Sequence, residues 1–285
     1  MKPSAFDYFA PETLEGALHH LAELGDEASV LAGGQSLLAM MNLRVAAPPA
    51  LIDVMRIRSL QTLERDARCV SIGAGIRMSR AARECGIPLL TRALGHVGHA
   101  AIRNAGTICG SVAHADPSAE VPGVLVALDG EVVLQSTRGT RTVAAADFFT
   151  SFFTTARQPD ELVTHVRVPH RARRTSFQEV TPRMGGSTGE FATAAVAAAA
   201  EVDGAGRLQD VAIALVGVGE RPMRADVAEA QLTDAQASAD LFTAAGEAAA
   251  GAVAPAADVH AGPAHRRRLV ATLVRRALEE IAEDR

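Results

Sequence analysis

The spacing of apolar residues divides the first part of the chain into short strands and amphipathic helices. A helix is predicted after Thr13, a good N-cap, and before Gly25, which suits a helix C-terminus. Its apolar residues at helical spacing are Leu14, Ala17, Leu18, Leu21 and Leu24. Short apolar runs predict strands at 28–32, 50–54, 59–63, 69–73, 131–135 and, with clean alternation, 161–168. Further helices are expected at 37–41, from 80–84, over 88–97 and at 121–128.

The same pattern continues after a basic segment, His170-Arg-Ala-Arg-Arg174. We interpret this segment as a solvated linker and place a domain boundary there. Beyond it, strands are predicted at 176–180 and 208–218, and helices at 224–231, 234–251 and 266–283. Strands and helices alternate through about residue 100, which favours α/β or mixed α+β layering, and the second half is predicted to be a compact α+β domain. The fold class we expect is α+β. The expected domains are 1–174, with lobes of about 1–57 and 58–174, and 175–285.

Composition narrows the class of protein. The 285 residues are 48% hydrophobic and 21% charged, so the chain can bury a large core. A net charge of −5, 4% aromatic residues and no tryptophan give no reason to expect binding to nucleic acid. We expect no membrane insertion, because no apolar run reaches about 18 residues and the N-terminus lacks a signal-peptide pattern. The three cysteines have no disulfide or zinc spacing, which favours a reduced, cytoplasmic protein.

Two glycine-containing turns are the main candidates for binding. One is Leu31-Ala-Gly-Gly-Gln-Ser-Leu37 and the other is Thr107-Ile-Cys-Gly-Ser-Val-Ala-His-Ala-Asp-Pro117. Glycine permits close backbone approach, so such turns can direct several N–H groups at an anion. Together they suggest one extended, phosphate-bearing ligand held from two sides, although each turn alone is also compatible with ordinary tight-turn structure. Neither matches the dinucleotide fingerprint of Rossmann folds or the P-loop, which disfavours a nicotinamide-linked dehydrogenase of that fold.

Residues for acid–base or metal chemistry are not apparent. The nine histidines are scattered, and His96 and His99, which could share a helix face, lack a third ligand, so a structural or surface pair is the better interpretation. Cys109 is expected to be a buried, inert thiol unless a nearby helix N-terminus stabilises its thiolate. Asp116 and Glu120 could either cap the following helix or accept hydrogen bonds from ligand hydroxyls. We therefore predict no catalytic residue and no metal site in this chain, and a phosphate cradle without acid–base groups favours a redox cofactor.

Four motifs in combination resemble the FAD-binding medium subunit of molybdenum hydroxylases, the family of carbon monoxide, xanthine and nicotine dehydrogenases. They are Ala32-Gly-Gly-Gln-Ser-Leu37, Ile72-Gly-Ala-Gly75, Ile102-Arg-Asn-Ala-Gly-Thr107 and Gly110-Ser-Val-Ala-His-Ala-Asp-Pro117. The resemblance covers essentially the whole length. It implies a two-lobed FAD-binding domain of the vanillyl-alcohol-oxidase (PCMH) type, followed by a C-terminal α+β flavoprotein domain.

The resemblance also implies which residues contact FAD. The pyrophosphate would be held by one turn and supported from the opposite side by the other, Glu120 would bond to cofactor hydroxyls, and Ile102 and Arg103 would lie near the isoalloxazine. The implied binding residues are Ala32, Gly33, Gly34, Gln35, Ser36, Leu37, Ile102, Arg103, Thr107, Ile108, Cys109, Gly110, Ser111, Ala115 and Glu120.

The function implied by the resemblance is electron transfer within a heterotrimer. A large partner subunit would carry the molybdenum cofactor, a small partner would carry two [2Fe–2S] clusters, and FAD in this chain would pass their electrons to an external acceptor. A dimer of heterotrimers is expected. A stand-alone FAD-dependent oxidoreductase and a nucleotide-binding scaffold without flavin are the alternatives.

Two departures from the family pattern lead to further expectations. Cys109 stands where glycine is common, and we expect ordinary backbone there, because a left-handed cysteine would cost about 1–2 kcal/mol. Residues 182–188, before Gly189-Glu-Phe-Ala192, form a longer segment than usual. Our hypothesis is that Arg183 lies near the flavin as a cation that stabilises its reduced form.

Overall fold

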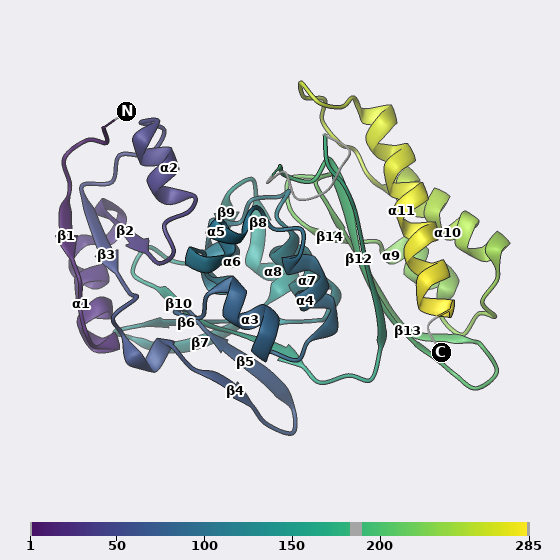
Figure 1. Cartoon of the computed structure of the whole chain (residues 1–285), viewed down its shortest axis with the longest axis horizontal. Helices are drawn as coiled ribbons and strands as arrows, with labels where there is room; N and C mark the ends of the chain where they lie inside the picture. Colours follow the sequence, from purple (N-terminus) through teal and green to yellow (C-terminus); the bar gives the residue numbers. More distant parts are fainter. Residues whose placement is uncertain (1, 183–189, 284–285) are drawn as a thin grey trace.

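The computed structural model describes residues 2–182 and 190–283, which form three parts along the long axis of the molecule (Figure 1). A small N-terminal lobe lies at one end, a central lobe of helices and an antiparallel sheet follows, and a second antiparallel sheet covered by two long helices lies at the other end. This mixture of separate helices and strands confirms the α+β prediction. No helix in the described ranges is long and apolar enough to span a bilayer.

The N-terminal lobe is built on a parallel sheet of order β1-β3-β2. Its strands are β1 (Asp7–Phe9), β2 (Ala28–Leu31) and β3 (Ala50–Asp53), and its helices are α1 (Leu14–Leu24) and α2 (Leu37–Asn42), with a 3₁₀ turn (η1, Gly25–Glu27) between α1 and β2. As predicted, the Thr13 side chain accepts a hydrogen bond from the Gly16 amide at 3.1 Å, and Gly25 ends α1 with φ of 52°. The glycine-containing turn connects β2 of this lobe to α2.

The central lobe contains a five-stranded antiparallel sheet of order β4-β5-β10-β6-β7. The strands are β4 (Leu63–Arg65), β5 (Cys69–Gly73), β6 (Glu131–Ser136), β7 (Gly139–Ala144) and β10 (Leu162–Pro169). The helices are α3 (Met78–Glu84), α4 (Pro88–Leu94), α5 (Ala100–Ala105), α6 (Ile108–His114), α7 (Glu120–Ala127) and α8 (Ala145–Phe148), and β8 (Phe149–Ser151) pairs with β9 (Thr154–Thr155). The predicted strand at 59–63 is wrong: a 3₁₀ turn (η2, Arg58–Leu60) buries Leu60 completely. A short apolar run cannot distinguish a strand from such a turn.

The C-terminal layer is an antiparallel sheet of order β11-β12-β13-β14, with α10 and α11 over its outer face (Figure 1). Its elements are β11 (Arg174–Val180), β12 (Ala194–Val202), β13 (Leu208–Val216), β14 (Met223–Arg224), α9 (Asp226–Leu232), α10 (Ala239–Ala252) and α11 (Pro263–Glu283). Alternate residues of β12 serve two cores: Ala195 and Ala197 face the central lobe, whereas Val196 and Ala198 face α10 and α11. Small side chains let helices pack closely on both faces of this sheet.

The segment between β10 and β11 is exposed at residues 170–172, as expected of a solvated linker, but that prediction is wrong for Arg173. Its side chain is only 2% exposed and lies 3.3 Å from the carboxylate of Asp129 and 3.6 Å from that of Asp210. Arg171 contacts the same two carboxylates. Since both acids come from distant parts of the chain, the local sequence could not reveal that these arginines join the central lobe to the C-terminal sheet.

Candidate functional site

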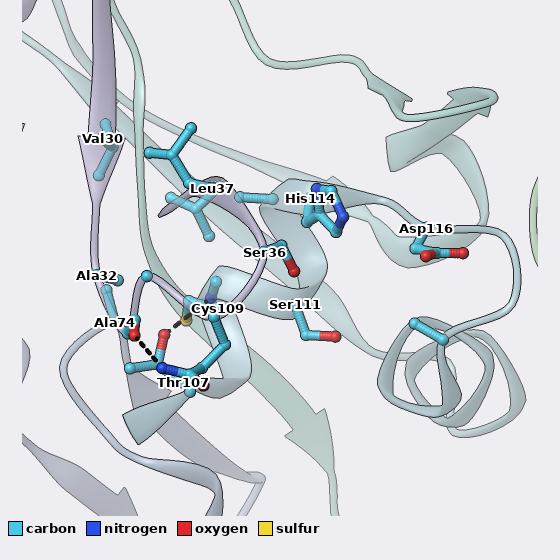
Figure 2. A pocket seen from close by; sticks show the side chains of 18 of the residues that line it. Val30, Ala32, Ser36, Leu37, Ala74, Thr107, Cys109, Ser111, His114 and Asp116 are labelled. Carbon is cyan, nitrogen blue, oxygen red and sulfur yellow. Dashed lines mark hydrogen bonds between the residues drawn. The ribbon is translucent and has the colours of Figure 1, made fainter. Parts of the chain in front are cut away.

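A cavity of about 360 Å³ brings the two glycine-containing turns together between the N-terminal and central lobes. Figure 2 shows side chains from both turns along it, with Ser36 and Leu37 near Ser111 and Cys109. Its volume is in the range of small-molecule and cofactor sites. The predicted residues that form its wall are Ala32, Gly33, Gly34, Gln35, Ser36, Leu37, Ile102, Thr107, Cys109, Gly110, Ser111 and Glu120.

The turn between β2 and α2 depends on its glycines. A Cβ on Gly33 would lie 2.3 Å from the carbonyl oxygen of Ala105, at the end of α5, and Gly34 has φ of 69°. The turn therefore packs directly against the backbone of the central lobe. Within 2–182 and 190–283, no hydrogen bond uses the main-chain N–H of Gly33 or Gly34, and these groups are available to a ligand.

The second turn is the start of helix α6. The Thr107 side chain caps it by accepting a hydrogen bond from the Gly110 amide at 3.0 Å, and the Ile108 amide donates to Ile76. Cys109 is helical, which confirms the expectation of ordinary backbone at that position. Burial raises the pKa of its thiol to about 12, and its Sγ donates to the Ile72 carbonyl at 3.5 Å. Cys109 is thus the inert thiol that the sequence favoured.

Three of the predicted binding residues lie behind the cavity wall. Arg103 donates hydrogen bonds from Nη1 to the carbonyls of Val97 and Gly98, at 2.8 and 2.6 Å, and so fixes the segment before α5. Ile108 is fully buried in the core, and Ala115 ends α6 in a left-handed conformation with φ of 51°. Val97 and Gly98 themselves line the cavity, so Arg103 shapes its wall from behind.

Asp116 and Glu120 lie at the end of the cavity away from Thr107 (Figure 2 labels Asp116). Neither caps α7: its N-cap is Ala119, without a side-chain bond, and Glu120 is its first residue. Asp116 instead accepts a hydrogen bond from the Ser118 amide at 2.8 Å. Burial raises the pKa of both carboxyls, that of Glu120 to about 8 with a further contribution from the charge of Glu179.

Sequence reasoning missed part of the wall. Arg157 and Glu161, before β10, line the cavity. Arg157 donates to the carbonyls of Gln158, Pro159 and Glu161, while Glu161 accepts a bidentate pair of bonds from Arg141. The local sequence pattern predicted only a strand in this region. It could not show that these side chains line the cavity, because tertiary contacts bring them there.

The histidine pair is not a metal site. His96 lies in the turn after α4, and His99 is the N-cap of α5, so the two do not share a helix face. Over residues 2–182 and 190–283 no group of three or more potential ligands could hold a metal ion. Arg183 and the rest of 183–188 fall outside the described residues, so its proposed place near the flavin stays a hypothesis.

The residues of the cavity fit a flavin dinucleotide. Its walls offer free amides at a glycine turn for phosphate oxygens, apolar surface from Leu37, Val54 and Met78 for a ring system, and carboxyls at one end for hydroxyl groups. A side chain on Gly33 would occupy the place where this turn meets α5. The arrangement can bind and orient such a cofactor, and it presents no nucleophile paired with a base.

Comparisons with known proteins agree with this description. Residues 4–171 match the FAD binding domain in molybdopterin dehydrogenase, and residues 183–281 match the CO dehydrogenase flavoprotein C-terminal domain. The 6-hydroxypseudooxynicotine dehydrogenase complex subunit alpha of Paenarthrobacter nicotinovorans is 34% identical, over 98% of this chain and 95% of that protein. The carbon monoxide dehydrogenase medium chain of Hydrogenophaga pseudoflava is 32% identical, over 98% and 97%.

Solved structures give the same result. The chain superposes with a TM-score of 0.94 on carbon monoxide dehydrogenase from Hydrogenophaga pseudoflava, at 33% identity over 99% of this chain and 98% of that one. It superposes equally well, with a TM-score of 0.94, on quinoline 2-oxidoreductase from Pseudomonas putida 86, at 31% identity over 99% of both chains. Both domains, the whole length and the architecture agree, and the chain belongs to the family of FAD-binding medium subunits of molybdenum hydroxylases.

Proposed function

We propose that this chain binds FAD in the cavity between its glycine-containing turns and transfers electrons within a molybdenum hydroxylase. The observation that carries the proposal is the convergence of the two turns on one cavity with unbonded amides at Gly33 and Gly34. Membership of a family whose domain is described as FAD-binding supports FAD as the occupant. When bound, FAD supplies the redox chemistry, since it accepts electrons singly and releases them singly or in pairs.

The residues of this chain bind and orient the cofactor. The amides of Gly33 and Gly34 would donate to the pyrophosphate from one side, and the N-terminus of α6 around Cys109 and Gly110 would support it from the other. Thr107 holds that helix terminus in place through its bond to Gly110. Ile102 and Val97, fixed from behind by Arg103, would bound the ring system and exclude water from it.

Two partner subunits complete the proposed enzyme. Relatives of this chain are named as a medium chain or as a subunit of a dehydrogenase complex, which supports a large subunit with the molybdenum cofactor and a small subunit with two [2Fe–2S] clusters. No group of potential ligands for such a centre occurs within residues 2–182 and 190–283. We propose a dimer of heterotrimers. Three free cysteines, two of them buried, support a location in the reducing cytoplasm.

Purification of the assembled complex from its host tests this function. We expect the chain to co-purify with a large and a small subunit, and the complex to contain flavin, molybdenum and iron–sulfur clusters, with flavin reduced by substrate only when all three subunits are present. A colourless chain that does not take up added FAD would exclude the FAD assignment. A flavin-containing chain that turns over substrate without partners would instead identify a stand-alone oxidoreductase.

A further inference from the structure

An acidic cluster lies at the end of the cavity, where β11, α7 and the turn after α4 meet. Glu120 is 6% exposed and lines the cavity, and the side chain of Glu179 on β11 is 1% exposed. Neither carboxylate oxygen of Glu179 has a hydrogen-bond partner among the described residues. His96, half exposed at the surface, places its Nδ1 3.5 Å from Glu179 Oε2. Glu179 thus lies beside a half-exposed imidazole, and its charge acts on Glu120 at the cavity wall.

We propose that Glu120 faces the FAD as a protonated carboxyl that donates a hydrogen bond, and that Glu179 is the positioning residue that keeps the proton there. This inference rests on the proposed function, because it assigns a role toward FAD. A carboxyl beside cofactor hydroxyls is usually expected to be ionised and to accept hydrogen bonds, and the proposal assigns Glu120 the opposite state. His96 gives the pair a route for proton exchange with solvent.

The charges around the pair support the protonated state. Ionisation of one buried carboxyl raises the free-energy cost of ionising a neighbouring one when no cation compensates the charge. Burial raises the pKa of Glu179 to about 7, and burial together with the charge of Glu179 raises that of Glu120 to about 8. His96 does not compensate, because burial and the nearby Arg92 lower its pKa and leave the imidazole neutral at pH 7.

Within residues 2–182 and 190–283, no other element supplies the missing positive charge. On α4, Arg92 is paired with Glu280 of α11, and that carboxylate also accepts bonds from Ser176 and Gln178. Between α6 and α7, Asp116 adds negative charge, while burial lowers the pKa of His114. In the described part of the chain, the titratable groups around the pair, on packed elements or across the cavity, are Arg92, His96, His114, Asp116, Arg157, Glu161 and Glu190, with Glu280 on the opposite face of β11.

A protonated Glu120 has a physical advantage in this cavity. FAD brings two phosphate charges, and in the described part of the wall the only guanidinium is that of Arg157. An ionised Glu120 would add repulsion in a site from which the bound cofactor excludes water. A neutral carboxyl avoids that repulsion and can still bond to a hydroxyl or carbonyl of the cofactor.

The sign of proton exchange on FAD binding tests the proposal. Calorimetry of FAD binding to the full-length chain, freed of flavin, in buffers of different ionisation enthalpy gives the number of protons exchanged. At pH 8, where Glu120 is about half protonated in the free protein, we expect net uptake of about half a proton. Proton release would overturn the proposal, since it means that the complex holds an ionised Glu120.

Two variants and a control assign the effect. Glu120→Gln should abolish the uptake while keeping a neutral donor and FAD affinity within about threefold of wild type. Glu179→Gln should move the pH at which FAD affinity begins to fall about one unit toward acid, because it removes a like charge. Glu84→Gln, at an exposed carboxylate paired with Arg80, should change neither quantity.

The outcomes separate the two hypotheses. Uptake that persists in Glu120→Gln, or an affinity profile unmoved in a folded Glu179→Gln protein, would overturn the role of the pair even though FAD binds. If Glu179→Gln does not fold, the wild type and Glu120→Gln still decide through the proton count. No binding of FAD by the wild-type chain would overturn the proposed function itself.

Discussion

Two adjacent residues of strand β11 show how surroundings set the pKa of a carboxyl: Gln178 bonds to the half-buried carboxylate of Glu280, and Glu179 carries a buried carboxyl of its own. Gln178 faces outward, where it and Ser176 donate hydrogen bonds to Glu280 of α11. Glu179 faces inward, toward α4 and α7, and its oxygens have no hydrogen-bond partner in the described part of the chain. Burial alone raises the pKa of Glu280, but bonds from Ser176 and Arg92 outweigh it and lower that pKa below its ordinary value. At Glu179 nothing opposes burial, and the pKa rises to about 7.

The presence or absence of hydrogen-bond partners distinguishes polar groups that stabilise the fold from those that we expect to contact a ligand. In the C-terminal layer, Arg266 and Glu280 are bonded to carbonyls or side chains and hold helix α11 on its sheet. Around the cavity, the amides of Gly33 and Gly34 and the carboxyl of Glu179 lack partners in the described chain. Buried polar groups are nearly always bonded in native proteins. Single unbonded atoms also occur away from the cavity, at Arg173 and at Nε of Arg266. The unbonded amides of Gly33 and Gly34 differ from these because they border a space that a ligand can fill.

The largest effect is a loss of stability expected in the C-terminal layer, where Arg266 is hydrogen-bonded. Arg266 is buried on α11, donates to the carbonyls of Thr193 and Gly217 at 2.5 and 2.6 Å, and pairs with Asp258. We expect Arg266→Ala to lower the free energy of unfolding by about 3 kcal/mol, since it leaves buried carbonyls unbonded. Urea unfolding measures this loss. Arg275→Ala, which removes an exposed partner of Glu279 on the same helix, should cost less than about 0.5 kcal/mol, and equal losses would contradict the distinction.

The next effect tests the cavity. Gly33→Ala places a Cβ 2.3 Å from the Ala105 carbonyl oxygen, so the turn must move away from α5. We expect FAD affinity to fall about 30-fold, equivalent to about 2 kcal/mol, because the amides lose their alignment. Flavin fluorescence on titration of FAD measures this change. Gly251→Ala, where nothing lies within 4 Å of the new Cβ, should leave affinity unchanged; the same loss in both would show that helix or turn propensity, not the cavity, is responsible.

A smaller effect concerns pH. The folded pKa of Glu120, about 8, and that of Glu179, about 7, lie above the value of 4.5 for an unfolded glutamate, so the folded chain binds more protons between these limits. The stability of the flavin-free chain therefore falls as pH rises through that window. Between pH 7 and pH 8.5, above the ordinary pKa of histidine, we expect a loss on the order of 1.5 kcal/mol. The Glu120→Gln/Glu179→Gln double variant should lose most of this slope in urea unfolding, and an unchanged slope would show that other groups cause it.

What the sequence could predict follows from how far apart the contacting residues lie in the chain. The cap at Thr13, the turn at Gly33 and the strand at 161–168 are local features, and their patterns were sufficient. The same is true of most of the predicted binding residues, which line the cavity because both turns carry recognisable motifs. Leu60 was misassigned because a segment as short as Ser59-Leu-Gln-Thr-Leu63 fits a turn as well as a strand.

The remainder depends on contacts between distant segments. Glu179 meets His96 across 83 residues of sequence and influences Glu120 across 59 (179 − 96 and 179 − 120), and no local pattern marks such a pair. Arg173 becomes buried only because Asp129 and Asp210 come from other elements. Sequence reasoning could therefore find the turns that hold the cofactor, but not the charges that surround it.

The smallest predicted effect compares two equivalent helix caps. Thr13 and Thr107 each accept a hydrogen bond from a glycine amide three residues on, at 3.1 and 3.0 Å, but only Thr107 lines the cavity. Replacement by valine keeps the shape and removes the oxygen, so each variant should lose about 1 kcal/mol of unfolding free energy. Only Thr107→Val should also weaken FAD binding, by about threefold to tenfold, because the start of α6 loses its fixed position beside the cofactor. Urea unfolding and FAD titration of both variants measure the two quantities, and equal FAD affinities would mean that the N-terminus of α6 does not support the cofactor.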